Sequence, residues 1–134
     1  MLFARLLSVL LVALGAACAQ RADFEFRTAS SVAIRHSNTV TGSRYERDVL
    51  FEAYQRAAVP KLRQCSSQMV VSEQEPVSVI FVLNAAGQVS QVYLDRETDL
   101  GRCFERALRA LVFPPPPFEG YHQQVRLAPE RNES

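Results

Sequence analysis

Apolar residues recur every three or four positions from Tyr45 onward, which is the spacing of one face of an α-helix. Pro60 interrupts this stripe, and a proline inside a helix removes one hydrogen bond and clashes with the preceding turn. The pattern predicts either one kinked helix or two helices, the second opening with Pro60 in its first turn. The stripe consists of Leu50, Phe51, Tyr54, Ala57, Ala58, Leu62, Cys65 and Met69.

Two alternating stretches follow, and they predict a hairpin. Residues 77–83 are rich in β-branched side chains, which favour a strand, and residues 89–95 form the return strand. Between them, Asn84 to Gly87 is typical of a tight turn in which the glycine adopts a positive φ. The period of two assigns the apolar residues of the return strand to opposite faces, Val89 with Tyr93 and Val92 with Leu94.

Helical spacing returns after Asp99, which we expect to be the N-cap of the second helix. Pro114 ends this segment, and the four prolines 114–117 form a rigid spacer. Residues 121–127 predict a last strand. The apolar stripe of the helix consists of Leu100, Cys103, Phe104, Ala107, Leu108 and Leu111.

The order helix, strand, strand, helix, strand predicts an α+β domain over residues 44–128. A strand–helix–strand unit places its two strands parallel and leaves room for one strand between them. Residues 77–83 fill that gap and pair antiparallel with both neighbours. We therefore expect a three-stranded antiparallel sheet with two helices packed on one face and residues 121–127 at an edge.

The first nineteen residues have the organisation of a secretory signal. A short basic start ends at Arg5, an apolar run covers residues 6–16, and the small residues 17–19 suit a signal peptidase. The run is shorter than the roughly 20 residues that span a bilayer, which favours cleavage after Ala19 over an uncleaved membrane anchor. The protein is then periplasmic or secreted.

Cys18 offers a second processing route. Gly15 to Cys18 resembles a bacterial lipoprotein box, in which Cys18 becomes the lipidated first residue. That box normally opens with Leu, Val or Ile, whereas this one opens with Gly15. Lipid anchoring to the envelope is therefore the alternative localisation.

Residues 20–43 are polar and rich in turn-forming residues, which predicts an arm or linker outside the domain. Two short alternating patches, Phe24 with Phe26 and Val32 with Ile34, are each candidates for an extra strand. Residues 129–134 form a polar tail.

After signal removal two cysteines remain, Cys65 and Cys103, and both lie on apolar helix stripes. An oxidising compartment allows a disulfide to persist, so we expect these two to be bonded. The alternative is a pair of buried free thiols.

The sequence offers no catalytic or metal-binding constellation. His36 and His122 have no cysteine or carboxylate at metal-ligand spacing, and no nucleophile–base pair can be assembled. A formal net charge of +1 gives no argument for nucleic acid or an anionic membrane surface. We therefore expect a non-enzymatic protein without metal, cofactor or small-molecule substrate.

Four sequence features together resemble one known family. They are residues 62–65 (LRQC), residues 77–83 followed by 86–89 (AGQV), Cys103 opening a helix that runs through 107–111 (ALRAL), and Phe113-Pro114 with Gly120 before the last strand. In this order they resemble the TonB C-terminal domain superfamily, most closely its AgmX/PglI C-terminal-like branch. The likeness covers residues 45–128.

The resemblance implies a fold and a habit of binding other envelope proteins, in TonB through the edge of the last strand. TonB proteins also keep an uncleaved anchor and a long proline-rich span, which this chain lacks in the predicted organisation. The resemblance therefore implies no energy transduction here.

These arguments predict an adaptor whose partner is an envelope protein or an extended peptide bound at residues 121–127. The candidate partner-binding residues are Tyr121, His122, Gln124 and Arg126, the last three facing away from the helices. A plain protected edge, or pairing of this edge with residues 24–27 or 32–35, are rival interpretations. The alternative function is a structural component of an envelope complex.

Overall fold

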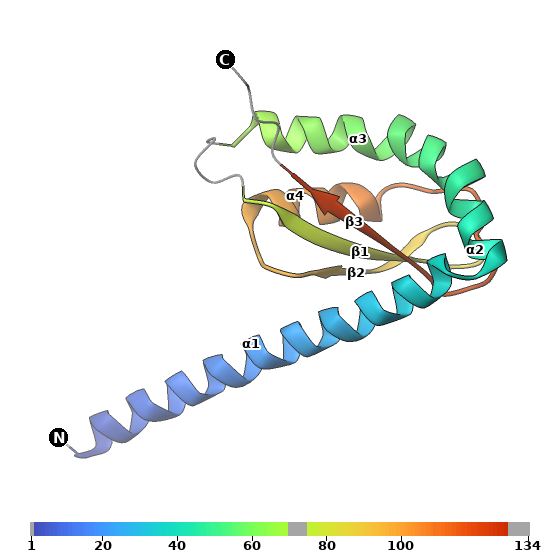
Figure 1. Cartoon of the computed structure of the whole chain (residues 1–134). Helices are drawn as coiled ribbons and strands as arrows, with labels where there is room; N and C mark the ends of the chain where they lie inside the picture. The colour runs from blue at the N-terminus through green and yellow to red at the C-terminus, as the bar shows by residue number, and fades with distance from the viewer. Residues whose placement is uncertain (1, 70–74, 129–134) are drawn as a thin grey trace.

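The computed structural model describes residues 2–69 and 75–128, with the side chains of the first helix described from Gly15 onward. The predicted tail, 129–134, lies outside the described residues. The elements in chain order are α1 (Leu2–Ser37), α2 (Val40–Tyr45), the π-helical segment η1 (Glu46–Leu50), α3 (Phe51–Ser67), β1 (Val77–Leu83), β2 (Val89–Leu94), α4 (Asp99–Arg109) and β3 (Tyr121–Leu127) (Figure 1).

The predicted α+β fold is confirmed. The strand order is β2-β1-β3, and β1 pairs antiparallel with both neighbours. Val77 lies opposite Leu127 and Leu83 opposite Tyr121, so the predicted bounds of the last strand agree with the structure. Helices α3 and α4 cover one face of this sheet, and α1 crosses the other (Figure 1).

The main core lies between the sheet and the α3–α4 layer. Alternate residues of β1 from Val77 to Leu83 point into it and are fully buried. They pack against Ala58 of α3 and against Phe104 and Leu108 of α4. Burial of this apolar surface is the main stabilising contribution to the domain.

A β-bulge changes the faces predicted for β2. Val82 lies opposite Gln91, but the next residue, Leu83, lies opposite Val89, so β2 carries one additional residue at this point. The extra residue moves Val89 to the face that packs on the main core. The prediction that Val89 and Tyr93 share a face is therefore wrong, because Tyr93 packs on the opposite side.

Within the predicted polar arm, residues 20–37 belong to α1 and residues 40–43 to α2, with a turn between them, so the candidate strands in this segment are helical instead. Ala29 and Ala33 of α1 are buried against Ile80 of β1, with Phe26 and Tyr93 beside them. The spacing of Phe26, Ala29 and Ala33 is that of a helix face, and the small alanines allow close approach to the sheet. The segment therefore forms a second, smaller core layer.

The structure shows how α3 accommodates Pro60 and which residue caps α4. α3 runs without a break through Pro60, so the first apolar stripe is one helix. The N-cap of α4 is Thr98, not Asp99, because the Thr98 hydroxyl accepts a hydrogen bond from the Gly101 amide at 3.0 Å. Asp99 instead lies in the first turn, where a negative charge is favourable near the helix N-terminus.

The predicted disulfide between Cys65 and Cys103 is confirmed. It joins the end of α3 to the start of α4, with the two Cα atoms 5.8 Å apart. Such a bond is compatible with an oxidising compartment outside the cytoplasm. Within the described residues, no helix has the length and apolarity needed to cross a membrane.

Candidate binding cleft at the sheet edge

Strand β3 forms one edge of the sheet, as predicted, with β1 as its neighbour. In an antiparallel pair, the backbone groups of successive residues point alternately toward and away from the neighbouring strand. The His122 amide donates to the Nδ1 atom of His36 at 3.1 Å, so it points away from β1. The alternation then directs the amides and carbonyls of Gln124 and Arg126 outward as well.

Helix α1 covers part of this edge. Besides the bond from His122 to His36, the Ser30 hydroxyl donates to the side-chain oxygen of Gln124 at 2.7 Å. The ring of His36 also meets the ring of His122, with centroids 5.4 Å apart. Residues 24–27 and 32–35 therefore do not pair with this edge as strands. They belong to helix α1, which contacts the edge through side chains.

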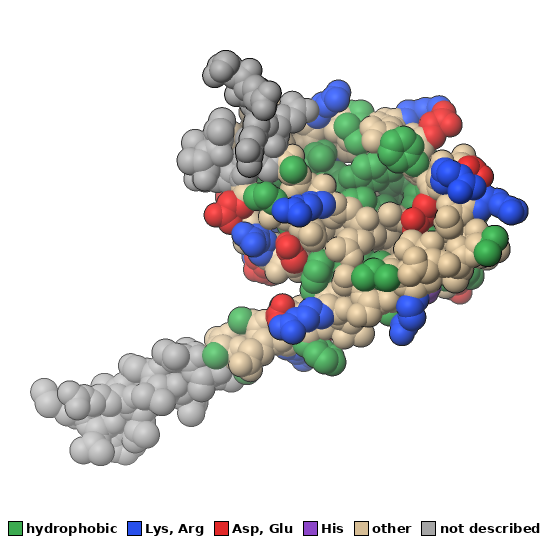
Figure 2. All heavy atoms as spheres, in the orientation of Figure 1, with side chains coloured by type: hydrophobic (Ala, Val, Ile, Leu, Met, Phe, Trp, Pro, Cys, Tyr) green, Lys and Arg blue, Asp and Glu red, His purple; other side chains and the backbone are tan. Residues whose placement is uncertain are grey.

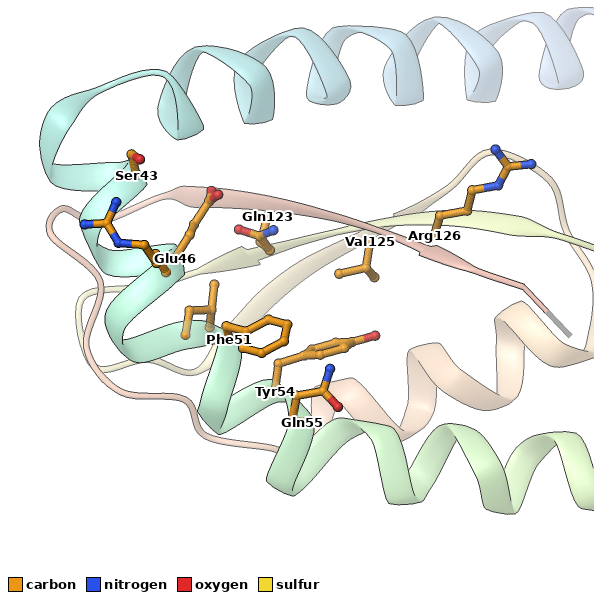
Figure 3. A pocket seen from close by; sticks show the side chains of 10 residues that line it. Ser43, Glu46, Phe51, Tyr54, Gln55, Gln123, Val125 and Arg126 are labelled. Atoms are coloured by element: carbon orange, nitrogen blue, oxygen red, sulfur yellow. The ribbon is translucent and has the colours of Figure 1, made fainter. Parts of the chain in front are cut away.

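The predicted partner-binding residues have different surroundings. Tyr121 is fully buried, His122 and Gln124 contact α1, and Arg126 is exposed. Figure 3 shows the Arg126 side chain pointing away from α3, toward the side on which α1 lies. These side chains therefore do not form a single contact surface.

A cleft of about 560 Å³ lies on the other side of β3, between this strand and the start of α3. Figure 2 shows hydrophobic side chains gathered in this hollow. Phe51 has 62% of its surface exposed there, and Tyr54 stands beside it (Figure 3). The lining residues are Ser43, Glu46, Arg47, Leu50, Phe51, Tyr54, Gln55, Gln123, Val125 and Arg126.

Two buried tyrosines, Tyr45 and Tyr121, pack against each other next to the cleft-lining residue Glu46. The Tyr121 hydroxyl donates to Glu46 Oε1 at 2.6 Å, and the Tyr45 hydroxyl donates to the Pro114 carbonyl at 2.8 Å. Burial raises the pKa of Tyr121, and the hydrogen bond to Glu46 adds to this shift. Burial also raises the pKa of Tyr45 to about 12. Both phenols therefore stay protonated. Tyr121 holds η1 against β3, and Tyr45 ties the end of α2 to the proline segment before β3.

Gln123 carries an unusual polar group at the floor of the cleft. Its side-chain nitrogen donates to the Gln124 carbonyl at 3.2 Å, which is one of the outward-facing edge acceptors. Its side-chain oxygen is buried and has no hydrogen-bond partner among the described residues. A buried acceptor without a donor is energetically unfavourable, which marks this position for a ligand donor.

The π-helical segment η1 supplies Glu46, Arg47 and Leu50 to the cleft. Such segments are rare and are frequent at functional sites. Sequence reasoning did not identify this cleft, although one signal was present. Leu50 and Phe51 are adjacent and lie about 100° apart around a helix, so a narrow apolar stripe buries one of them better than the other.

Within the described residues, no group of three or more His, Cys, Asp and Glu side chains is placed to hold a metal ion. Comparisons with protein-family models, with curated proteins and with solved structures found no match to this chain. The resemblance to the TonB C-terminal superfamily therefore remains a prediction from the sequence, and the assignment of function depends on the cleft.

Proposed function

We propose that the protein is an exported adaptor of the cell envelope that captures an extended peptide as an additional strand on β3. The observation that carries this proposal is the position of the cleft, which borders the edge strand and includes Gln123, Val125 and Arg126. A sheet edge offers amides and carbonyls to a peptide backbone, while an adjacent cleft receives alternate side chains.

The edge available to a peptide is short. The His122 amide is held by His36 and the Gln124 carbonyl by the Gln123 side chain, which leaves the His122 carbonyl, the Gln124 amide and both backbone groups of Arg126 facing outward. A peptide of a few residues is sufficient to pair with them. Every second side chain then enters the cleft and packs on Phe51 and Val125.

The predicted export signal is consistent with the proposal. The first nineteen residues have the features of a signal, and cleavage after Ala19 would leave the part of α1 that packs on the sheet. Lipidation at Cys18 is the alternative, and it would anchor the same domain to a membrane. The resemblance to the TonB C-terminal superfamily favours the same edge as the binding site.

The experiment is a selection of random peptides displayed on phage against residues 20–134, followed by fluorescence polarisation with the enriched peptides. Gln124→Pro removes an outward-facing amide without removing a bond to β1, and a proline is tolerated on an edge strand in this orientation. Gln124→Ala is the matched control, because it loses the same side chain but keeps the amide. We expect Gln124→Pro to abolish binding and Gln124→Ala to retain it. Equal binding by both variants would contradict strand addition.

A second candidate function is a structural component of an envelope complex, docked through α1. Phe24 and Ile34 on this helix are 69% and 55% exposed, which favours a protein contact. Co-purification of an envelope assembly that depends on Phe24 and Ile34, but not on the Gln124 amide, would favour this function over peptide capture.

A further inference from the structure

Two hydrogen-bond acceptors, the Glu46 carboxylate and the Gln123 side-chain oxygen, belong to residues that line the cleft. The side-chain oxygen of Gln123 is buried without a partner among the described residues. Its identity as oxygen is assigned by the other end of the amide, because the Gln124 carbonyl requires the donating nitrogen. Figure 3 shows Glu46 and Gln123 together at the end of the cleft remote from Arg126.

Glu46 gives this end a negative charge. One of its oxygens accepts the Tyr121 hydroxyl at 2.6 Å, and within the described residues the carboxylate makes no ion pair. Arg47 also lines the cleft, but its guanidinium is paired with Asp48 at 2.9 Å. The charge of Arg47 is therefore largely compensated locally, and that of Glu46 is not.

Aromatic side chains form the wall next to these acceptors. Phe51 and Tyr54 both line the cleft, and burial raises the pKa of Tyr54 to about 12, so it remains a neutral ring. Aromatic faces attract cations, and the methylene stem of a long basic side chain packs well on them. The cleft thus offers a carboxylate, an amide oxygen and apolar walls to one side chain.

We propose that the cleft binds a basic side chain, preferably arginine, of the captured peptide. This inference rests on the proposed function, because strand addition on β3 is what directs alternate peptide side chains into the cleft. A guanidinium has five donors, enough to reach both Glu46 and the Gln123 oxygen, whereas a lysine ammonium presents three around a single point. A carboxylate in the same place would be repelled by Glu46.

The test uses the peptides enriched on the wild-type protein. We expect them to share one arginine or lysine at a fixed position. Where that residue is arginine, replacing it with citrulline, which keeps the side-chain shape but not the charge, should weaken binding about tenfold. Glu46→Gln keeps an acceptor for Tyr121 but removes the charge, and it should abolish the difference between the arginine and citrulline peptides.

Glu52→Gln is the matched control, because Glu52 is an exposed α3 carboxylate that pairs with Arg56 and does not line the cleft. It should preserve the preference for arginine. Enriched peptides that bind through the Gln124 amide but share no basic residue, or that bind equally with citrulline, would overturn this inference and leave strand addition intact. A selection that enriches no peptide would overturn both proposals.

Discussion

The backbone amide of His122 donates a hydrogen bond to the Nδ1 atom of His36, and this bond fastens the end of α1 to the start of the edge strand. His36 therefore carries its proton on Nε2 when neutral. Burial lowers the pKa of His36, and the neighbouring positive charges of His122 and Arg35 lower it further. The rings of Phe118 and Tyr121 complete its surroundings.

This relationship predicts a loss of stability in mild acid. The pKa of His36 is lower in the folded protein than its ordinary value of 6.5, so the unfolded chain takes up the proton first. The contribution of His36 to the free energy of unfolding is complete above pH 6.5. It is lost as the pH falls from there through the lowered pKa of the folded protein. We expect the melting temperature to fall between about pH 7 and pH 5, as His36 becomes a donor facing a donor.

His36→Asn tests the assignment, because an asparagine side-chain oxygen can replace Nδ1 as the acceptor but does not titrate in this range. The variant should show a smaller difference in melting temperature between the two pH values than the wild type. Exchange of the His122 amide with deuterium should be slow at neutral pH and faster in acid. An unchanged pH dependence in His36→Asn would assign the effect to other groups.

The disulfide between Cys65 and Cys103 should contribute measurably to the free energy of unfolding. Cys65 and Cys103 are separated by 38 positions, and closing a loop of this length restricts the unfolded chain by roughly 4 kcal/mol in the chain-entropy description. Because small domains have free energies of unfolding of about 5–15 kcal/mol, the double variant Cys65→Ala, Cys103→Ala should unfold at much lower urea concentration. Alkylation of native protein without reductant, followed by intact mass measurement, should label neither residue.

The sequence was sufficient to predict elements whose ends are marked by turn chemistry. The bounds of β3 agree with the structure because the prolines and Gly120 precede it, and Gly87 adopts the positive φ expected for its turn. The pairing of β1 with both neighbours followed from the connection rules alone. The cysteine pair was predictable because both residues lie on inward stripes of adjacent helices.

The second core layer and the cleft were not predictable in the same way. Phe26, Ala29 and Ala33 have helical spacing, but small alanines among polar residues give a weak pattern, and the shorter alternating patches masked it. The cleft joins Glu46 and Phe51 to Gln123, which is distant in the chain, and it depends on a π-helical turn. No local pattern specifies such a turn.

The packing of α1 on the sheet predicts that a charge at its contact face will detach it. Ala33 is 4% exposed and packs against Ile80, so Ala33→Asp would bury an unpaired carboxylate. We expect a loss of stability of about 2 kcal/mol or more, with faster exchange of the His122 amide. Ser31→Asp is the matched control on an exposed position of the same helix, and it should have little effect. Equal losses in both variants would mean that α1 does not depend on this contact.

Gly87 and Gly120 both have a positive φ, but only Gly87 is closely surrounded by other atoms. Substituting each by alanine therefore distinguishes the cost of backbone strain from the cost of a steric clash. Gly87 has a φ of 83°, and a Cβ atom there would lie 1.8 Å from the Phe113 carbonyl oxygen. Gly120 has a φ of 77°, but a Cβ atom there would meet nothing within 4 Å. Gly120→Ala should therefore cost only the strain of the left-handed conformation, about 1 kcal/mol. Gly87→Ala should cost several times more, because the Phe113 amide also donates to the Gly87 carbonyl at 2.8 Å and this close approach must be broken. Urea denaturation of both variants measures the two costs, and similar losses would show that the hairpin turn moves freely away from Phe113.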